Sequence, residues 1–240
     1  MGREMAERIM LITGAGSGIG AAIARHFAAP GTVIYGCGRR LEPLTQQAEE
    51  LRGFGCEAHP RACDMTDSAA VDELVAEIVA RHGRLDVLVA NAGIAVNRPF
   101  VDTDDGLLEE IMRVNVLGTF ACCRAAFRHM RLAEAGTIIT IGSVVSHRGY
   151  PNQAAYTASK HAIAGFTKSL CAEAQPFGVR VACIMPGGVA TDMVRATRPD
   201  LDDEAMIQPE DVAEATRYLV DLPRRIAIDS IAMRRWAAAP

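Results

Sequence analysis

The sequence predicts an α/β protein in which a doubly wound parallel sheet of about seven strands is covered by helices on both faces. Segments with strand-like and helix-like patterns alternate along nearly the whole chain. The strand-like segments are continuous apolar runs, as expected for strands that are buried on both faces. The chain has 240 residues, 50% of them hydrophobic, which is enough for one large core. Because no repeat, linker or low-complexity tract divides the chain, we expect residues 1–240 to form one domain.

The first part of the chain predicts three strands and two helices. RIMLIT (8–13) is a short apolar run that ends in glycines, which is typical of a buried strand. Residues 18–29 carry apolar side chains four positions apart, as one face of a helix requires. TVIYGC (32–37) predicts a second strand, and the apolar spacing over 41–51 predicts a second helix. EAHPRACD (57–64) predicts a third strand with a weaker pattern.

The middle of the chain predicts a strand between two helices. Apolar residues over 71–79 indicate an amphipathic helix, with Asp67 as its expected N-cap. LDVLVA (85–90) predicts the strand, and a long helix is expected over about 106–130. Apolar residues cover more than one face of this long helix, so it has two surfaces to bury. One surface can pack on the sheet, and the other can face either another subunit or a loop of the same chain. We expect the subunit.

The last part of the chain predicts three strands and two helices. TIITIG (137–142) and VRVACIM (179–185) are apolar runs that predict two buried strands. A long helix is expected between them, over 154–175, and a proline and a glycine stop it. Residues 209–222 predict a further helix, and IAIDSIAM (226–233) predicts the last strand.

Charge and cysteine content exclude several classes of protein. The formal net charge is −4 and no block of like charge occurs, so we expect neither nucleic-acid nor membrane-surface binding. No apolar run reaches the length of a membrane span, and the first residues lack the pattern of a signal peptide. Seven cysteines without a CxxC motif indicate reduced thiols, a cytoplasmic location and no metal site.

A glycine-rich turn follows the first predicted strand in TGAGSGIG (13–20). Ile19 stands where the G-x-G-x-x-G fingerprint has its third glycine, so the spacing is instead Gly14, Gly16, Gly18 and Gly20. Glycines permit a tight turn and a close approach of phosphate, and the following helix offers free N–H groups. An ordinary strand-to-helix turn is the alternative. The position between strand and helix favours a dinucleotide site.

The end of the second predicted strand bears on the choice of dinucleotide. An acidic residue at this place would bind a ribose 2′-hydroxyl and select NAD. The chain instead has Gly38, followed by Arg39 and Arg40. A guanidinium suits a 2′-phosphate, so we expect NADP(H) to be preferred, with NAD(H) still possible. The alternative is that both arginines are solvated at the start of a helix, where cations are unfavourable.

One further cluster predicts chemistry. Tyr156 and Lys160 are four residues apart on a predicted helix, so they share one face of it. A nearby ammonium group favours a phenolate and lowers the pKa of a tyrosine. Ser143, at the end of the fifth predicted strand, can orient a carbonyl oxygen. The three side chains can therefore exchange a proton with a substrate oxygen. Taken singly, the pair could be a solvated surface pair and the serine a cap.

Seven motifs in order make the chain resemble the short-chain dehydrogenase/reductase family over roughly residues 8–233. They are TGAGSGIG (13–20), CDMTD (63–67), NAG (91–93), the asparagine of RVNVLG (113–118), IGS (141–143), YTASK (156–160) and PGGVAT (186–191). The resemblance implies a single Rossmann-fold domain that carries its own catalytic site. Family members are commonly tetramers, so it also implies a homotetramer or a dimer built on the helices 107–130 and 154–175.

The resemblance implies catalytic roles for four residues. Tyr156 would be the acid/base of the reaction. Lys160 would lower the pKa of Tyr156 and hold the nicotinamide ribose. Ser143 would polarise the substrate carbonyl. Asn115 would hold a water in a proton relay, although it could equally be a satisfied core amide.

The resemblance also implies a set of cofactor contacts. Ile19 would lie along the cofactor, Asp64 would meet the adenine ring, and Arg39 would accompany NADP(H). Gly93 would let the adenine ribose region pass close to the fourth strand, with Asn91 as a structural support. Asp64 could instead cap a helix, and Thr191 could cap the segment after it. The complete set of expected cofactor-binding residues is Gly14, Gly16, Ser17, Gly18, Ile19, Gly20, Arg39, Arg40, Asp64, Met65, Asn91, Ala92, Gly93, Tyr156, Lys160, Pro186, Gly187, Val189 and Thr191.

Two parts of the chain depart from the family pattern. The end, IAIDSIAMRRWAAAP, lacks the glycine-rich tail of many members. It resembles the subgroup of small NADP-dependent reductases that act on 3-hydroxy acids and related small carbonyl compounds. The substrate-covering segment, 192–209, is short and charged, so we expect a small or partly exposed substrate. Arg195 and Arg198 could meet an anionic group or could be solvated.

These observations lead to one function and two alternatives. We expect an NADP-dependent oxidoreductase that interconverts a carbonyl and a secondary alcohol or hydroxy acid, with a small-molecule substrate. A 3-oxoacyl-thioester reductase would use the same residues but needs a basic surface for an acyl carrier, for which Arg124, Arg128 and Arg131 offer only a loose row. A non-catalytic, NADP-binding regulator is less expected, because the chain keeps Tyr156 and Lys160.

Overall fold

The computed structural model describes residues 8–197 and 202–236 and confirms the predicted fold class. Within this part of the chain, seven parallel strands form one sheet in the order β3-β2-β1-β4-β5-β6-β7. Their bounds are β1 Arg8–Thr13, β2 Thr32–Gly38, β3 Glu57–Ala62, β4 Val87–Ala90, β5 Gly136–Ile141, β6 Val179–Pro186 and β7 Ser230–Met233. The order runs outward from β1 in both directions, as a doubly wound sheet requires.

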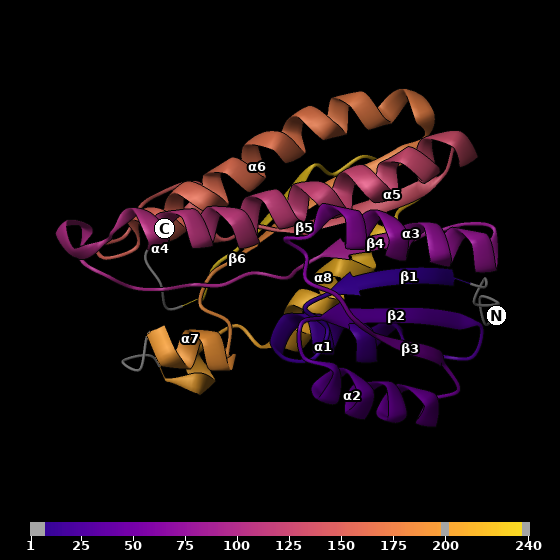
Figure 1. The fold of residues 1–240 in the computed structure, drawn as a ribbon, viewed down its shortest axis with the longest axis horizontal. Helices are drawn as coiled ribbons and strands as arrows, with labels where there is room; N and C mark the ends of the chain where they lie inside the picture. Colours follow the sequence, from indigo (N-terminus) through magenta and orange to yellow (C-terminus); the bar gives the residue numbers. More distant parts are fainter. Residues whose placement is uncertain (1–7, 198–201, 237–240) are drawn as a thin grey trace.

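Helices cover both faces of this sheet (Figure 1). The helices are α1 Gly18–Phe27, α2 Leu41–Gly53, α3 Ser68–His82, α4 Asp105–Met112, α5 Thr119–Ala133, α6 Ala154–Ala174, α7 Asp192–Thr197 and α8 Pro209–Val220. The predicted N-cap of α3 is confirmed, since the Asp67 carboxylate accepts from the backbone N–H groups of Ala69 and Ala70. No helix among the described residues is long and apolar enough to cross a membrane.

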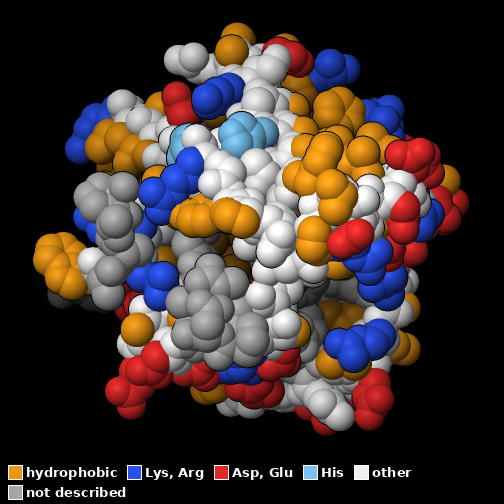
Figure 2. Space-filling view, turned by 90° about the vertical axis from the view of Figure 1, so that its left-hand side faces the viewer, with side chains coloured by type: hydrophobic (Ala, Val, Ile, Leu, Met, Phe, Trp, Pro, Cys, Tyr) orange, Lys and Arg blue, Asp and Glu red, His pale blue; other side chains and the backbone are white. Residues whose placement is uncertain are grey.

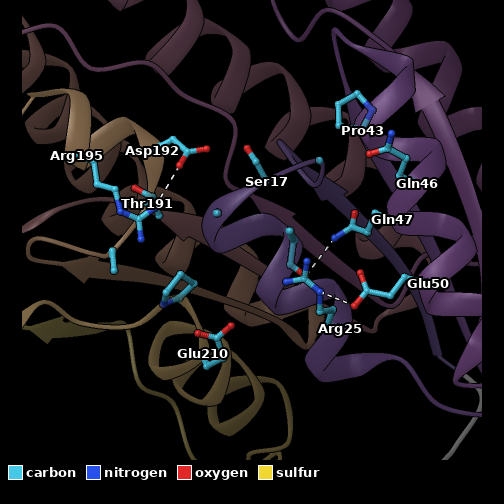
Figure 3. Close-up of a pocket in the computed structure, with 15 residues that line it drawn as sticks. Ser17, Arg25, Pro43, Gln46, Gln47, Glu50, Thr191, Asp192, Arg195 and Glu210 are labelled. Atoms are coloured by element: carbon cyan, nitrogen blue, oxygen red, sulfur yellow. Dashed lines mark hydrogen bonds and ion pairs between the residues drawn. The ribbon is translucent and has the colours of Figure 1, made fainter. Parts of the chain in front are cut away.

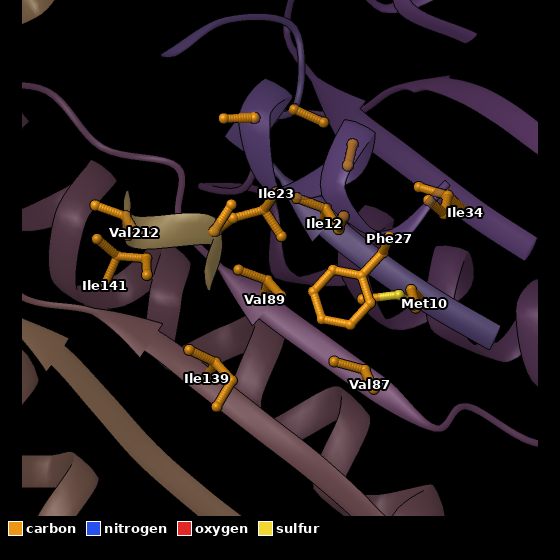
Figure 4. Packing of buried hydrophobic residues seen from close by; sticks show 14 of the residues in the cluster. Met10, Ile12, Ile23, Phe27, Ile34, Val87, Val89, Ile139, Ile141 and Val212 are labelled. Carbon is orange, nitrogen blue, oxygen red and sulfur yellow. The ribbon is translucent and has the colours of Figure 1, made fainter. Parts of the chain in front are cut away.

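The alternation of side chains along β1 divides the core into two layers. Met10 and Ile12 point toward α1, α2 and α8, where Phe27 fills the space between helix and sheet (Figure 4). Ile9 and Leu11 point to the other face, toward α3, α5 and α6. Because successive residues of a strand face opposite sides, a continuous apolar run serves both layers.

The expected long helix over 106–130 contains a local change of winding. Its middle, Arg113–Gly118, is a π-helix that joins α4 to α5. Such a segment carries one extra residue per turn, and the sequence pattern did not indicate it. Leu117 and Phe120 remain 62% and 47% exposed in the chain. A loop of the same chain therefore does not bury these two side chains. The subunit contact stays a prediction.

Two further boundaries differ from the sequence expectation. The last strand begins at Ser230 rather than at 226, since Cys183 of β6 is the first residue with which β7 pairs. The segment 192–209 contains the short helix α7 and the 3-10 turn Asp203–Ala205. Neither α7 nor the 3-10 turn has a periodic pattern of apolar residues. Ion pairs of Arg195 with Asp192 and Asp203 join them instead.

Candidate active site and cofactor cleft

The expected site residues gather where the strands end. All strands point the same way, so the segments after β1, β4, β5 and β6 meet at one edge of the sheet. Figure 2 shows this end of the molecule, which is hollowed and mixes hydrophobic with basic side chains. Ligands of doubly wound proteins bind at this edge.

The glycine turn after β1 has the backbone of a phosphate cradle. Gly14 and Gly18 have φ angles of +66° and +52°, a region that favours glycine. A Cβ on Gly20 would overlap the carbonyl oxygen of Gly14 and lie 2.7 Å from Nδ2 of Asn91. The start of α1 therefore lies directly on the turn, with its free N–H groups beside it.

Asn91 holds this turn against the end of β4. Its Nδ2 donates to the carbonyl oxygens of Thr13 and Gly14, at 2.9 and 3.3 Å. The hydroxyl oxygen of Thr13 accepts from the backbone N–H groups of Asn91 and Ala92. The supporting contacts expected of Asn91 are thus present, and they place Ala92 at the same edge.

A pocket of about 350 Å³ borders the glycine turn (Figure 3). Gly16, Ser17 and Gly18 form one wall, and Thr191 and Arg195 belong to the wall opposite. A Cβ on Gly18 would lie 3.1 Å from Cγ2 of Thr191. The structure therefore brings Thr191, which is distant in sequence, against the turn.

The segment after β6 reaches Thr191 through a chain of backbone contacts. Gly187, next to Pro186, donates its N–H to the carbonyl oxygen of Met233 in β7. Val189 forms a parallel bridge with Ile207. The Thr191 hydroxyl accepts from the N–H of Val194 at 3.4 Å, so Thr191 does cap the segment after it, as one of the two alternatives held.

Arg195 is engaged by its own chain. Its guanidinium lies 2.8 Å from a carboxylate oxygen of Asp203 and 3.2 Å from one of Asp192. The charge that an anionic substrate would need is therefore already paired. Arg198 lies outside the described residues.

Arg39 and Asp64 lie near each other at the expected adenine end. Arg39 and Arg40 are exposed after β2. The carboxylate of Asp64 accepts from the N–H of Thr66 at 2.9 Å, and this hydrogen bond lowers the pKa of Asp64. The positive charge of Arg39 lowers this pKa further, so the two side chains lie within electrostatic reach. Asp64 closes a turn here and does not cap α3.

Lys160 is held beneath the reacting end. The residue is 5% exposed, and its Nζ donates to the carbonyl oxygen of Ile141 at 2.8 Å. The ammonium nitrogen lies 5.7 Å from the centre of the Tyr156 ring. Burial lowers the pKa of Lys160 to about 8. Its carbonyl oxygen accepts from the hydroxyl of Ser146, a contact that the sequence did not indicate.

The pKa of Tyr156 moves in the direction opposite to the sequence expectation. Burial raises the pKa to about 12, and a hydrogen bond with Ser143 opposes this rise. The expected lowering by Lys160 is not a cause of the shift, because desolvation of the phenol outweighs the other influences. Tyr156 and Ser143 are nevertheless in hydrogen-bond contact, as the proton-transfer site requires.

The side chain of Asn115 is hydrogen-bonded to three groups of the protein. It is 0% exposed, and its Oδ1 accepts from the N–H of Ile94 at 2.8 Å. Its Nδ2 donates to the Ile94 carbonyl oxygen and to the hydroxyl of Ser159. The amide is therefore satisfied, and it ties the π-helix to α6. A Cβ on Gly93 would lie 3.1 Å from Asn115 and 3.8 Å from Nζ of Lys160, so Gly93 borders the reacting end.

The Met65 side chain is packed inside the protein and is not exposed at the edge of the sheet. It is 6% exposed, and its sulfur lies 3.3 Å from Sγ of Cys122. Gly118 of the π-helix packs on the Met65 backbone, where a Cβ would lie 3.1 Å from the carbonyl oxygen. Met65 therefore joins the segment after β3 to the long helix.

Comparison with known proteins places these features in one family. Residues 8–202 match the family model of the short chain dehydrogenase. A protein of Streptomyces coelicolor named "Putative ketoacyl reductase" is 34% identical over 233 residues, covering 88% of this chain and 89% of its own length. An alcohol dehydrogenase of Thermococcus sibiricus, solved with 5-hydroxy-NADP, has a TM-score of 0.88 at 28% identity, covering 97% of this chain and 98% of its own. A metagenomic short-chain oxidoreductase in complex with NADP has a TM-score of 0.85 at 29% identity, covering 98% of this chain and 100% of its own.

Proposed function

The chain belongs to the short-chain dehydrogenase/reductase family and is an oxidoreductase, and we propose that it interconverts a carbonyl group and a secondary alcohol with NADP(H). One observation carries this proposal. Ser143 follows β5, Tyr156 and Lys160 lie one turn apart on α6, and the three side chains come together near the end of β5.

The residues present fit a bound dinucleotide. At Gly14, Gly18 and Gly20 a side chain would be strained or would overlap protein neighbours, so glycine permits the tight turn at which a phosphate can approach the free N–H groups of α1. Gly16, Ser17 and Thr191 line the pocket beside this turn and would hold the cofactor, and Ile19, in the first turn of α1, would lie along it. When bound, NADP(H) supplies or accepts the hydride.

The three reacting side chains then divide the work. The Tyr156 hydroxyl donates its proton to the substrate oxygen during reduction and takes it back during oxidation. Because burial raises the pKa of Tyr156, its phenol is protonated at neutral pH, which is the form that donates a proton during reduction. The Ser143 hydroxyl orients the same oxygen, and the Lys160 ammonium, held by the Ile141 carbonyl, would bind the nicotinamide ribose of the cofactor as the resemblance implies. We place Asn115 in a positioning role through α6, together with the proton relay that the resemblance implies.

Arg39 supports a preference for NADP(H) over NAD(H). Its guanidinium is exposed beside Asp64, at the edge where the adenine half of the cofactor would lie. A guanidinium binds a phosphate through charge-assisted hydrogen bonds. Arg40, the next residue and the N-cap of α2, would add to the same positive potential.

The test is an initial-rate assay of the parent and of Tyr156→Phe. Small ketones, aldehydes, 3-oxo acids and 3-oxoacyl thioesters are offered with NADPH and, separately, with NADH. We expect an NADPH-dependent rate on one class, and a loss of about 10²–10⁴-fold in kcat for Tyr156→Phe with unchanged NADPH binding. Equal rates of variant and parent would mean that Tyr156 does not act in turnover, and would favour the alternative of a non-catalytic, NADP-binding regulator.

A 3-oxoacyl-thioester reductase is the second candidate. The name of the Streptomyces coelicolor relative supports it. The row of arginines expected to receive an acyl carrier offers little free positive charge. Arg128 is paired with Asp72 at 3.1 Å, and the Nε of Arg124 is buried. A rate on a free pantetheine thioester that an acyl carrier protein does not improve would favour the small-carbonyl reductase.

Assembly and location belong to the same proposal. Exposed Leu117 and Phe120 support contact between copies through the long helices, in a dimer or homotetramer. The six buried cysteines and the partly buried Cys171 suit a reducing cytoplasm.

A further inference from the structure

Two imidazoles and a carboxylate converge at the edge of the sheet. Glu57 and His59 alternate on β3, so their side chains share one face of this edge strand. His82 occupies the last turn of α3, which packs beside them. One ligand atom from each of the three residues lies within 4.8 Å of the others. Nε2 of His59 is 2.7 Å from Oε1 of Glu57.

Tyr35 of β2 holds both imidazoles in place. The His59 ring stacks on the phenol with ring centres 4.5 Å apart, and the His82 ring meets its edge at 5.7 Å. The Tyr35 hydroxyl lies 2.9 Å from Nε2 of His82. Both rings are thus oriented before any ligand arrives, and the side chain of His59 is only 16% exposed.

Charged groups surround the cluster, and Glu57 already pairs with one of them. Arg81 lies 3.1 Å from Glu57, and Arg61 lies over the Tyr35 ring and pairs with Glu77 at 2.5 Å. The carboxyl end of α3 contributes the negative end of its dipole.

We propose that Glu57, His59 and His82 bind one Zn²⁺ ion that ties the edge strand β3 to α3. Two imidazole nitrogens and one carboxylate oxygen are a known zinc ligand set, with a fourth position left for water. In the zinc-bound form the ring hydrogen of His59 would lie on Nδ1, so that the lone pair of Nε2 faces the ion. The site lies at the start of β3, whereas Arg39 and Asp64 follow the ends of β2 and β3. It is therefore separate from the proposed catalysis.

The proposed site departs from the expectation of a chain without metal ligands, which stays untested. The expectation rested on the cysteines, and burial raises the pKa of Cys37, Cys56 and Cys122, which disfavours their thiolates. His59 and His82 are 23 positions apart in sequence, at no motif spacing. Only the packing of α3 on β3 brings them together.

The test is a titration of the chelator-treated full chain with Zn²⁺ against a chromophoric zinc indicator. We compare the parent with His59→Asn, His82→Gln and the control His129→Gln, a histidine of α5 outside the cluster. We expect one tight ion per chain in the parent and the control, and affinity weaker by roughly tenfold or more in each cluster variant. Zn²⁺ should also raise the Tm of the parent and of the control, but not of His59→Asn.

Two results would overturn the site. One is a parent that binds Zn²⁺ no more tightly than His82→Gln does. The other is a Tm of the parent that does not respond to Zn²⁺. If either variant does not fold, Co²⁺ added to the parent gives the answer, since nitrogen ligation in a tetrahedral site produces strong visible absorption. A spectrum that remains that of hydrated Co²⁺ would reject the proposal.

Discussion

The ammonium group of Lys160 donates a 2.8 Å hydrogen bond to the carbonyl oxygen of Ile141, the last residue of β5. This contact joins α6 to the strand that ends two residues before Ser143. It holds the positive charge of Lys160 near the Tyr156 ring. Among the described residues, no carboxylate pairs with this ammonium group. Burial of the Lys160 ammonium therefore costs folding free energy by an amount that depends on pH. The position of the reacting side chains depends on β5.

Replacement of Lys160 by Met should change the pH dependence of stability. The pKa of Lys160 is about 8 in the folded chain and about 10.4 in an unfolded one. Between these values the unfolded chain binds more protons, so folding becomes more favourable as pH rises. Relative to Lys160→Met, the parent should gain about 2–3 kcal/mol of unfolding free energy between pH 7 and pH 10.

Urea unfolding at several pH values measures this gain. Lys168→Met is the matched control, because Lys168 is an exposed lysine of the same helix. Its curve should run parallel to that of the parent. Parallel curves for Lys160→Met as well would show that the ammonium group is not buried as described.

Substitution of Gly20 by Ala should disrupt the glycine turn. The new Cβ would overlap the Gly14 carbonyl oxygen and crowd Nδ2 of Asn91 at 2.7 Å. Crowding of this kind costs about 1–3 kcal/mol in a packed core, and here it also moves the phosphate cradle. We expect a lower Tm and at least a tenfold weaker binding of NADPH, measured by quenching of protein fluorescence.

Gly53→Ala provides the comparison for that experiment. Gly53 is the last residue of α2, and a Cβ there meets nothing within 4 Å. The variant should bind NADPH as the parent does and be equally or slightly more stable, by up to about 1 kcal/mol. Equal effects of both substitutions would contradict the role of the turn.

Reversal of charge at Arg39 should change the choice of cofactor. Arg39→Asp removes the guanidinium and places a second carboxylate near Asp64. Hydrogen bonds to charged groups contribute about 1.5–3 kcal/mol, so the KM for NADPH should rise roughly 10- to 100-fold. The KM for NADH should stay or fall. Arg131→Gln, an exposed arginine on α5, should alter neither. A parallel rise in both KM values would assign Arg39 a role that is not specific to the 2′-phosphate.

Replacement of Asn115 by Leu should destabilise the junction of the π-helix with α6. The change leaves the N–H and the carbonyl of Ile94 without their side-chain partner. An unsatisfied buried polar group costs about 1–3 kcal/mol. We therefore expect a loss of about 2–4 kcal/mol of unfolding free energy, measured by denaturant unfolding, and a lower kcat. A variant as stable as the parent would mean that water replaces both contacts.

Charge on the exposed face of the long helix should separate subunits. Leu117→Glu and Phe120→Asp place carboxylates on side chains that are 62% and 47% exposed in the single chain. If copies meet on this face, sedimentation should show a smaller assembly for the double variant than for the parent. Phe54→Asp, an exposed residue after α2, should not change the mass. An unchanged assembly would place the subunit contact elsewhere.

Much of the fold is readable from short-range patterns. The apolar run of β1 serves two core layers, and the Asp67 cap starts α3 as its position predicts. The glycine spacing places the turn where α1 begins. Each of these depends on residues within a few positions of one another, so the sequence contains the whole signal.

Other features have no short-range signal. The π-helix at Arg113–Gly118 does not interrupt the apolar pattern, and α7 has no such pattern at all. Arg195 looked available to a substrate, yet Asp203 lies eight positions further on and pairs with it. In each case the deciding partner comes from a distant turn or from packing, which composition and spacing do not encode.

The sequence by itself determined the sheet and the helices, because these follow from periodicity, and its ordered motifs predicted the candidate reacting residues. The tertiary structure alone decided their chemical state. Burial, rather than the neighbouring Lys160, sets the direction of the Tyr156 pKa. The same packing joins His59 and His82 into one cluster. Desolvation and long-range contact depend on what surrounds a side chain in space, and no local pattern in the chain specifies those surroundings.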